Sequence, residues 1–129
     1  MDYEKLVTID ADDLENELIK QPTIYLQIST ALSEVNKELD LTTEESKYLK
    51  ACKAMDIRRA SLANREKPPT AQFLEDAIAA DEEVHAIETK RVDLKEKSAV
   101  LFGVLKALEH KKEAMKSLGW IVFRNSEDM

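Results

Sequence analysis

Glycine, proline, cysteine and aromatic residues are all scarce in this chain of 129 residues. Two glycines and three prolines leave little room for turns, so long helices with few connections are expected. A single cysteine, Cys52, permits no disulfide within the chain, which suits a reducing compartment. No stretch reaches about 18 uncharged apolar residues, and the first residues are acidic. We therefore predict no membrane span, no secretory signal and a cytoplasmic protein, in the host cytoplasm if the source is viral.

Motifs that carry catalysis or bind cofactors are also missing. The sequence has no phosphate-binding glycine loop, no Cys-x-x-Cys pair and no His-Glu-x-x-His motif. His85 and His110 are 25 residues apart on one expected helix, so they cannot bind the same metal ion within one chain. Cys52 lies in an apolar stripe, where a buried side chain is more common than a nucleophile. We expect a binding protein without cofactor or metal, and not an enzyme.

What the chain does contain is charge and helix-forming residues. Charged residues make up 35% and hydrophobic residues 43%, which is enough apolar surface for a core. The pattern predicts one helical domain over 1–129 with five parts. They are an acidic segment with a short helix at 1–21, a first helical arm at 22–67 that begins at Pro22, a proline turn at 68–70, a long heptad helix at 71–118 and an extended tail at 119–129.

The first arm allows one bent helix or two consecutive helices, and we favour a break at 40–43, where Thr42 or Thr43 can cap a restarted helix. Thr70 is expected to cap the long helix, and Gly119 to end it in the left-handed conformation. The long helix would fold back on the first arm at the prolines. The predicted fold is therefore mainly α, a long antiparallel coiled-coil-like hairpin with a short amino-terminal helix and a short extended carboxyl-terminal segment.

An apolar seam runs from Phe73 to Met115 at alternating steps of four and three residues. This 3.5-residue repeat is typical of helices that supercoil with a partner. A second row, which includes His85 and Phe102, widens the apolar face beyond what one partner helix needs. We predict that neighbouring subunits cover the rest, giving a homo-oligomeric helical bundle or ring. The interface residues we assign are Leu94, Leu101, Phe102, Leu105, Leu108 and Met115.

Basic residues gather between Lys47 and Lys67, although the whole chain has a net charge of −7. This stretch contains seven lysine or arginine residues and two acidic residues, so its local net charge is +5. Nearby charges decide the field at a site, because screening limits their reach to about 8–10 Å. Such a surface favours contact with a phosphate backbone. The candidate DNA-binding residues are Lys47, Lys50, Lys53, Arg58, Arg59, Arg65 and Lys67.

Charge placement alone also fits other interpretations. The basic stretch can be an ordinary solvated helix face, because acids near helix starts and bases near helix ends complement the helix dipole. An acidic coiled-coil interaction or inhibitor protein would assemble without binding nucleic acid. A protein that mimics DNA and blocks a basic host protein is a third alternative.

Between about Asp13 and Phe123 the layout resembles the UvsY family of phage recombination mediators. The stretches that carry the resemblance are DDLE and KQP at 12–15 and 20–22, KAMDIRR and NREK at 53–59 and 64–67, IAADEEV at 78–84, and AMKSLGWIV at 114–122. The resemblance implies a protein that binds single-stranded DNA as a ring of about six or seven subunits. It also implies that the protein loads a RecA-like recombinase onto strands covered by a single-strand-binding protein. Arg58 matches the position of the basic residue that contacts DNA in the family.

Overall fold

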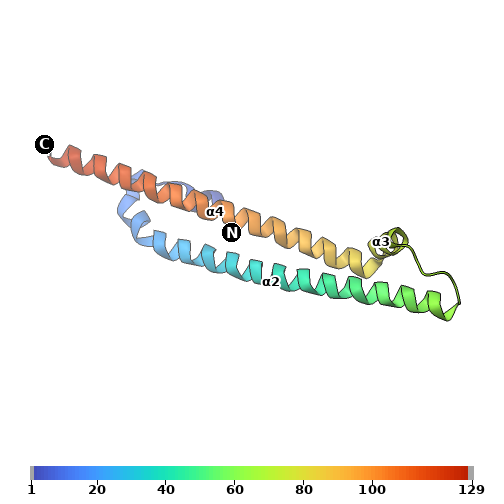
Figure 1. Ribbon diagram of the computed structural model, residues 1–129. Coiled ribbons are helices and arrows are strands. Elements are labelled where there is room, and N and C mark those ends of the chain that lie inside the picture. Colours follow the sequence, from blue (N-terminus) through green and yellow to red (C-terminus); the bar gives the residue numbers. More distant parts are fainter. Residues whose placement is uncertain (1, 128–129) are drawn as a thin grey trace. The chain divides into compact units, whose positions relative to one another are not determined.

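The computed structural model describes residues 2–127, and the side chains of all of these except Ala11 and 120–127. The described residues form helices and no strands (Figure 1). In chain order the helices are α1 (Tyr3–Val7), the 3-10 helix η1 (Ala11–Asp13), α2 (Leu14–Ala63), α3 (Ala71–Ala79) and α4 (Glu82–Glu127). The predicted mainly α fold with a long helical hairpin is confirmed. None of the described helices has a stretch long and apolar enough to cross a membrane.

The chain divides into two compact units, and the two long helices contribute to both. Unit 1 comprises Met1–Glu34 and Lys97–Met129, and unit 2 comprises Val35–Glu96. In each unit a stretch of α2 packs against a stretch of α4, as the blue-to-green and yellow-to-red ribbons show (Figure 1). Each unit therefore has its own contacts and its own candidate sites.

Unit 1 has an apolar centre with one buried cation. Its buried apolar side chains are Ile28, Leu101, Val104, Leu108 and Met115. Lys111 is only 4% exposed, and its ammonium group donates to the backbone carbonyl of Leu6 and pairs with Glu17. A buried ammonium is tolerated only when such partners replace water. Lys111 thus fastens the amino-terminal segment to α4.

The centre of unit 2 is more polar. Leu74, Val84 and Leu94 are buried, but the α2 side supplies Thr42 and Ser46, which are 1% and 3% exposed. The Ser46 hydroxyl donates to Glu88 of α4. Buried polar groups are stable when they are hydrogen-bonded, and they then select one register of the two helices.

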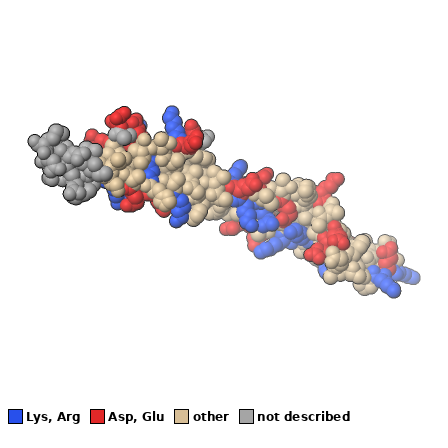
Figure 2. All heavy atoms as spheres, turned by 90° about the horizontal axis from the view of Figure 1, so that it is seen from above, with Lys and Arg blue, Asp and Glu red and all other residues tan. Residues whose placement is uncertain are grey.

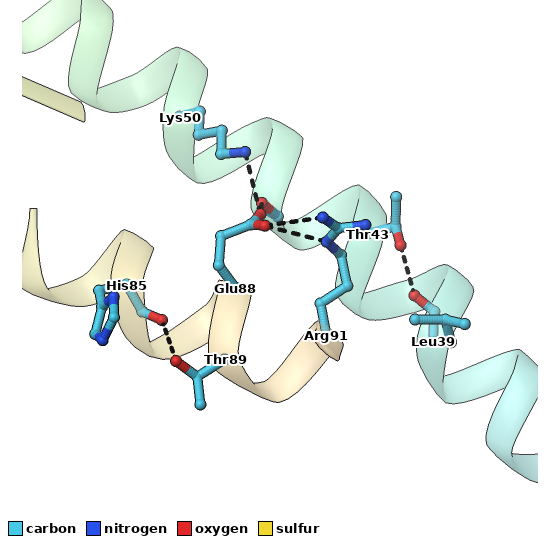
Figure 3. Close-up of polar contacts among 8 residues, drawn as sticks. Leu39, Thr43, Lys50, His85, Glu88, Thr89 and Arg91 are labelled. Carbon is cyan, nitrogen blue, oxygen red and sulfur yellow. Dashed lines mark hydrogen bonds and ion pairs between the residues drawn. The ribbon is translucent and has the colours of Figure 1, made fainter. Parts of the chain in front are cut away.

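Several predicted boundaries are wrong. α2 begins at Leu14 and continues through Pro22 and through 40–43, so neither the start at Pro22 nor the break exists. Pro22 removes only one backbone hydrogen bond, since its nitrogen has no hydrogen. The Thr43 hydroxyl bonds back to the Leu39 carbonyl at 2.8 Å within the helix, so it caps nothing (Figure 3).

The predicted long helix is interrupted once. α3 ends at Ala79 and α4 begins at Glu82, because an Asp81 carboxylate oxygen accepts from the backbone N–H groups of Glu83 and Val84 at 3.0 and 3.1 Å. Thr70 caps α3 by accepting from Phe73 N, as predicted.

The predicted extended tail is also wrong over 119–127. α4 passes through Gly119, which does not adopt a positive φ, and ends at Glu127. One glycine costs a helix only about 1 kcal/mol relative to alanine, so it does not have to end one. Residues 128 and 129 of the predicted tail lie outside the described residues.

Candidate nucleic-acid interface

The end of α2 has a tight cap that places Arg65 in the left-handed region. Arg65 has φ 55°, whereas no other non-glycine residue among those described has a positive φ. Its N–H donates to Leu62 O at 3.2 Å, and Glu66 N donates to Ser61 O at 2.9 Å. This bond pair ends many helices, usually with glycine at the left-handed position. An arginine there introduces strain of about 1–2 kcal/mol.

The four cations at this end of α2 are not neutralised within the part of the chain that the structure describes. Arg58, Arg59, Arg65 and Lys67 are exposed, and no acidic group among the described residues lies within 4.0 Å of their nitrogens. Exposed guanidinium groups donate in a fork that matches the oxygens of a phosphate. These four residues can therefore hold a polyanion without first breaking an ion pair.

Lys53 is held differently. Its ammonium nitrogen lies 3.3 Å from an oxygen of Asp81 and 3.3 Å from an oxygen of Glu83. The bonds to Glu83 and Asp81 raise the pKa of Lys53. The backbone N–H of Val84, and then Lys53 itself, lower the pKa of Asp81. Lys53 thus closes the junction between α3 and α4, and its charge is already balanced.

Lys50 and Lys47 are also paired. Lys50 Nζ lies 3.1 Å from Glu88 Oε1, and Lys47 Nζ lies 3.4 Å from Glu44 Oε1. Arg91 reaches the other Glu88 oxygen from one turn along α4, with its Nη2 at 3.0 Å (Figure 3). Hydrogen bonds from Ser46, Lys50 and Arg91 lower the pKa of Glu88 to about 2.

The seven predicted DNA-binding residues therefore divide into two groups. Lys47, Lys50 and Lys53 pair with acids, while Arg58, Arg59, Arg65 and Lys67 do not. On the face drawn in Figure 2, blue and red side chains alternate and no single basic field is visible. Tyr48 is 75% exposed, so one aromatic ring is available beside the paired lysines. The sequence identified the cations but missed the acids that neutralise three of them.

The six predicted interface residues differ in their exposure within the single chain. Leu94, Leu101, Leu108 and Met115 are at most 6% exposed within the single chain, so they leave no surface for a neighbouring subunit. They form the seam that faces α2 of the same chain. Of the remaining two residues, Leu105 is half-buried and Phe102 is 55% exposed, with Lys106 Nζ 5.3 Å from the centre of its ring.

The histidines and the cysteine do not combine into a site. His85 is exposed on α4, and Cys52 is half-buried in α2. Among the described residues, no three His, Cys, Asp or Glu side chains are placed to hold a metal ion.

Comparison with known proteins gives one fold likeness. The crystal structure of the bacteriophage T4 recombination mediator protein UvsY superimposes with a TM-score of 0.79 and 18% sequence identity. The match covers 95% of this chain and 92% of that chain. No family model matches the sequence, and no curated protein matches it. The chain thus has the fold of UvsY, as the sequence resemblance predicted.

Proposed function

We propose that this protein is a phage recombination mediator, which binds single-stranded DNA as a homo-oligomer and helps to load a RecA-like recombinase onto strands covered by single-strand-binding protein. The proposal starts from the fold shared with the T4 mediator over 95% of the chain. A likeness at 18% identity carries the fold alone, so the assignment depends on what this chain's own residues offer to DNA.

The observation that carries the proposal is the group of four unpaired cations at the end of α2. Arg58, Arg59, Arg65 and Lys67 project from the last turns of the helix and its cap, where a strand can approach without displacing an acid. Four cations in one subunit bind weakly, but repetition in an oligomer places many of them along one polymer. Linked weak sites of this kind raise overall affinity by several orders of magnitude.

Exposed apolar side chains on α4 support the oligomer. Val92 and Phe102 are 51% and 55% exposed, and both belong to the second apolar row of the helix. Scattered exposed apolar residues are ordinary, but exposed apolar residues in one row along a helix are typical of an interface. We therefore assign the subunit contacts to these side chains and not to the buried seam.

The test combines mass and DNA binding. Light scattering after size exclusion, with and without a dT oligonucleotide, should give a mass of several subunits that increases with DNA. Fluorescence anisotropy should show tight binding at about 50 mM salt and much weaker binding at about 200 mM. The double variant Arg58→Glu/Arg59→Glu should lose DNA and keep its mass. The matched control, Lys95→Glu/Lys97→Glu, reverses the same charge on α4 and should bind nearly as well as the parent.

A second candidate is an acidic interaction or inhibitor protein without affinity for nucleic acid. Two observations favour it, namely the net charge of −7 and the pairing of Lys47, Lys50 and Lys53 with acids. If the parent protein gives no anisotropy change with DNA even at the lowest salt, this candidate replaces the mediator.

A further inference from the structure

Unit 1 contains an open groove of about 670 Å³ between α2 and α4. The wall from α2 is mostly apolar, with Leu18, Pro22, Tyr25 and Leu26 beside the polar Gln21 and Ser29. These side chains are incompletely covered, with Leu26 66%, Leu18 41% and Tyr25 38% exposed. A volume in this range suits the few anchor side chains that one amphipathic helix inserts into a groove.

The wall from α4 has a positive character in an acidic protein. Lys112 and Lys116 line the groove, and no acid among the described residues lies within 4.0 Å of the Lys112 nitrogen. Lys116 has one loose partner, the exposed Glu113, at 3.7 Å.

The acid that also lines this wall, Glu109, is already engaged. The Tyr25 hydroxyl donates to Glu109 Oε1 at 3.3 Å, and Lys106 lies 3.8 Å from its other oxygen. The groove therefore offers one ammonium group that is unpaired among the described residues, Lys112, and one loosely paired group, Lys116, and a ligand with carboxylates beside its apolar face would complement them.

Gln21, which also lines the groove, has a buried hydrogen-bond acceptor without a donor in the part of the chain that the structure describes. Gln21 is 5% exposed, and its Nε2 donates to Leu108 O at 3.2 Å. Its Oε1 is buried and has no hydrogen-bond partner among the described residues. A buried acceptor left unpaired costs about 1–3 kcal/mol, which a ligand that brings a donor would recover.

We propose that this groove binds an acidic amphipathic α-helix of a partner protein. Apolar side chains at positions i, i+3 or i+4, and i+7 of that helix lie against Leu18, Tyr25 and Leu26. Its carboxylates face Lys112 and Lys116. A hydroxyl or amide group on its apolar face donates to Gln21. The site uses other residues than the cations at the end of α2, so the inference goes beyond DNA binding and does not depend on it.

The probe is a fluorescein-labelled synthetic helix of about 16 residues, with Leu, Leu and Phe at i, i+4 and i+7 and Glu at the flanking positions. Binding is measured by anisotropy at low salt against the full chain. We expect Leu26→Glu and Lys112→Glu/Lys116→Glu each to weaken binding by about tenfold or more.

Two matched controls lie outside the groove. Ile19→Glu changes a side chain on α2 that is 69% exposed, close to the 66% of Leu26, and Lys97→Glu reverses an exposed charge on α4. Both should stay within about twofold of the parent. Arg58→Glu/Arg59→Glu should keep peptide binding, so that loss of DNA binding and loss of peptide binding are separate results. Circular dichroism confirms that each variant keeps its helix content.

Three results would overturn the proposal. The first is no anisotropy change, or equal binding of a peptide in which lysine replaces every glutamate. The second is displacement of the probe by a dT oligonucleotide, which would assign the groove to nucleic acid. The third is a fall in the mass of the oligomer on Leu26→Glu, which would assign it to a second copy of this chain.

Discussion

The Lys53 ammonium nitrogen lies 3.3 Å from Oδ2 of Asp81, the residue that separates α3 from α4. The same carboxylate caps α4 through its other oxygen. A lysine that the sequence assigns to DNA is therefore part of a helix junction. This pairing separates two roles within the basic stretch, and the roles can be tested one residue at a time.

The cations at the end of α2 should determine the salt dependence of DNA binding. Arg58→Ala removes an unpaired charge, so the slope of log affinity against log salt should fall by about 0.7 per subunit in contact with the strand. Lys53→Ala removes a charge that Asp81 and Glu83 already balance, so the slope should not change. Anisotropy titrations at four salt concentrations measure both. Equal slopes for the two variants would contradict the division into paired and unpaired groups.

Glu88 should make unit 2 sensitive to acid. Its folded pKa, about 2, is below the usual 4.5, so its contribution to stability is complete above about pH 5 and falls as the pH drops from 4.5 towards 2. Glu88→Gln should lower the free energy of unfolding by about 1–2 kcal/mol at pH 7, and by less at pH 3. Urea unfolding at both pH values measures the difference. Lys90→Ala, which removes only an exposed pair with Glu38, is the control. A difference that stays constant with pH would contradict the role of the ionised carboxylate.

Arg65 should lower the stability of the fold while it strengthens DNA binding. Arg65→Gly relieves the left-handed backbone at φ 55°, so the free energy of unfolding should rise by about 0.5 kcal/mol or more while DNA binding weakens. Lys67→Gly removes a charge at a position without positive φ, so it should weaken DNA binding without the gain. Thermal unfolding and anisotropy on the same samples measure the two effects. A destabilised Arg65→Gly would mean that the arginine side chain makes a compensating contact.

Substitutions at buried and at exposed positions of α4 should affect folding and assembly separately. Leu108 is fully buried, so Leu108→Ala should lower the free energy of unfolding by about 2–5 kcal/mol. Phe102 is 55% exposed, so Phe102→Ala should change the unfolding of the chain little and should lower the mass of the oligomer. Light scattering and urea unfolding distinguish the outcomes. An unchanged mass would remove Phe102 from the subunit contacts.

The helical seam is predictable because the heptad repeat depends only on local geometry. Leu94, Leu101, Leu108 and Met115 recur every seven residues, and all four are buried. The helix that covers these side chains is less predictable, because an apolar stripe is the same whether it packs against the same chain or against another chain. Here the four side chains are already buried within the single chain, so the seam contributes to the fold of one subunit.

The interruption at Asp81 was concealed by the same repeat. Phe73, Ala77, Ala80 and Val84 keep the heptad steps across a break of two residues, so spacing alone gives no sign of it. The local signal is an aspartate before two glutamates, which is typical of a helix start. Pro22, Thr43 and Gly119 were expected to begin or end helices, but all three lie inside one. Threonine and glycine cost a helix interior up to about 1 kcal/mol and proline about 3 kcal/mol, and packing of the long helices outweighs these costs.

For the candidate site, the sequence identifies the cations but not their partners. Asp81, Glu83 and Glu88 are about 30–40 residues from the lysines they neutralise, and only the antiparallel register of the helices brings them together. Ser46 and Glu88 also give unit 2 a polar centre that no residue pattern along α4 indicates. Counting charges within the stretch from Lys47 to Lys67 therefore overestimates its positive potential, because acids from elsewhere in the chain pair with its lysines.

Lys111 has a consequence for the amino-terminal segment. Its ammonium group has two partners, the Leu6 carbonyl and Glu17, and is nearly sealed from water. Proteolytic removal of the first eight residues would take one partner away and hydrate the other. A protease cut near the amino terminus would therefore weaken the packing of α4 around Lys111, although α4 is far from the cut in the sequence.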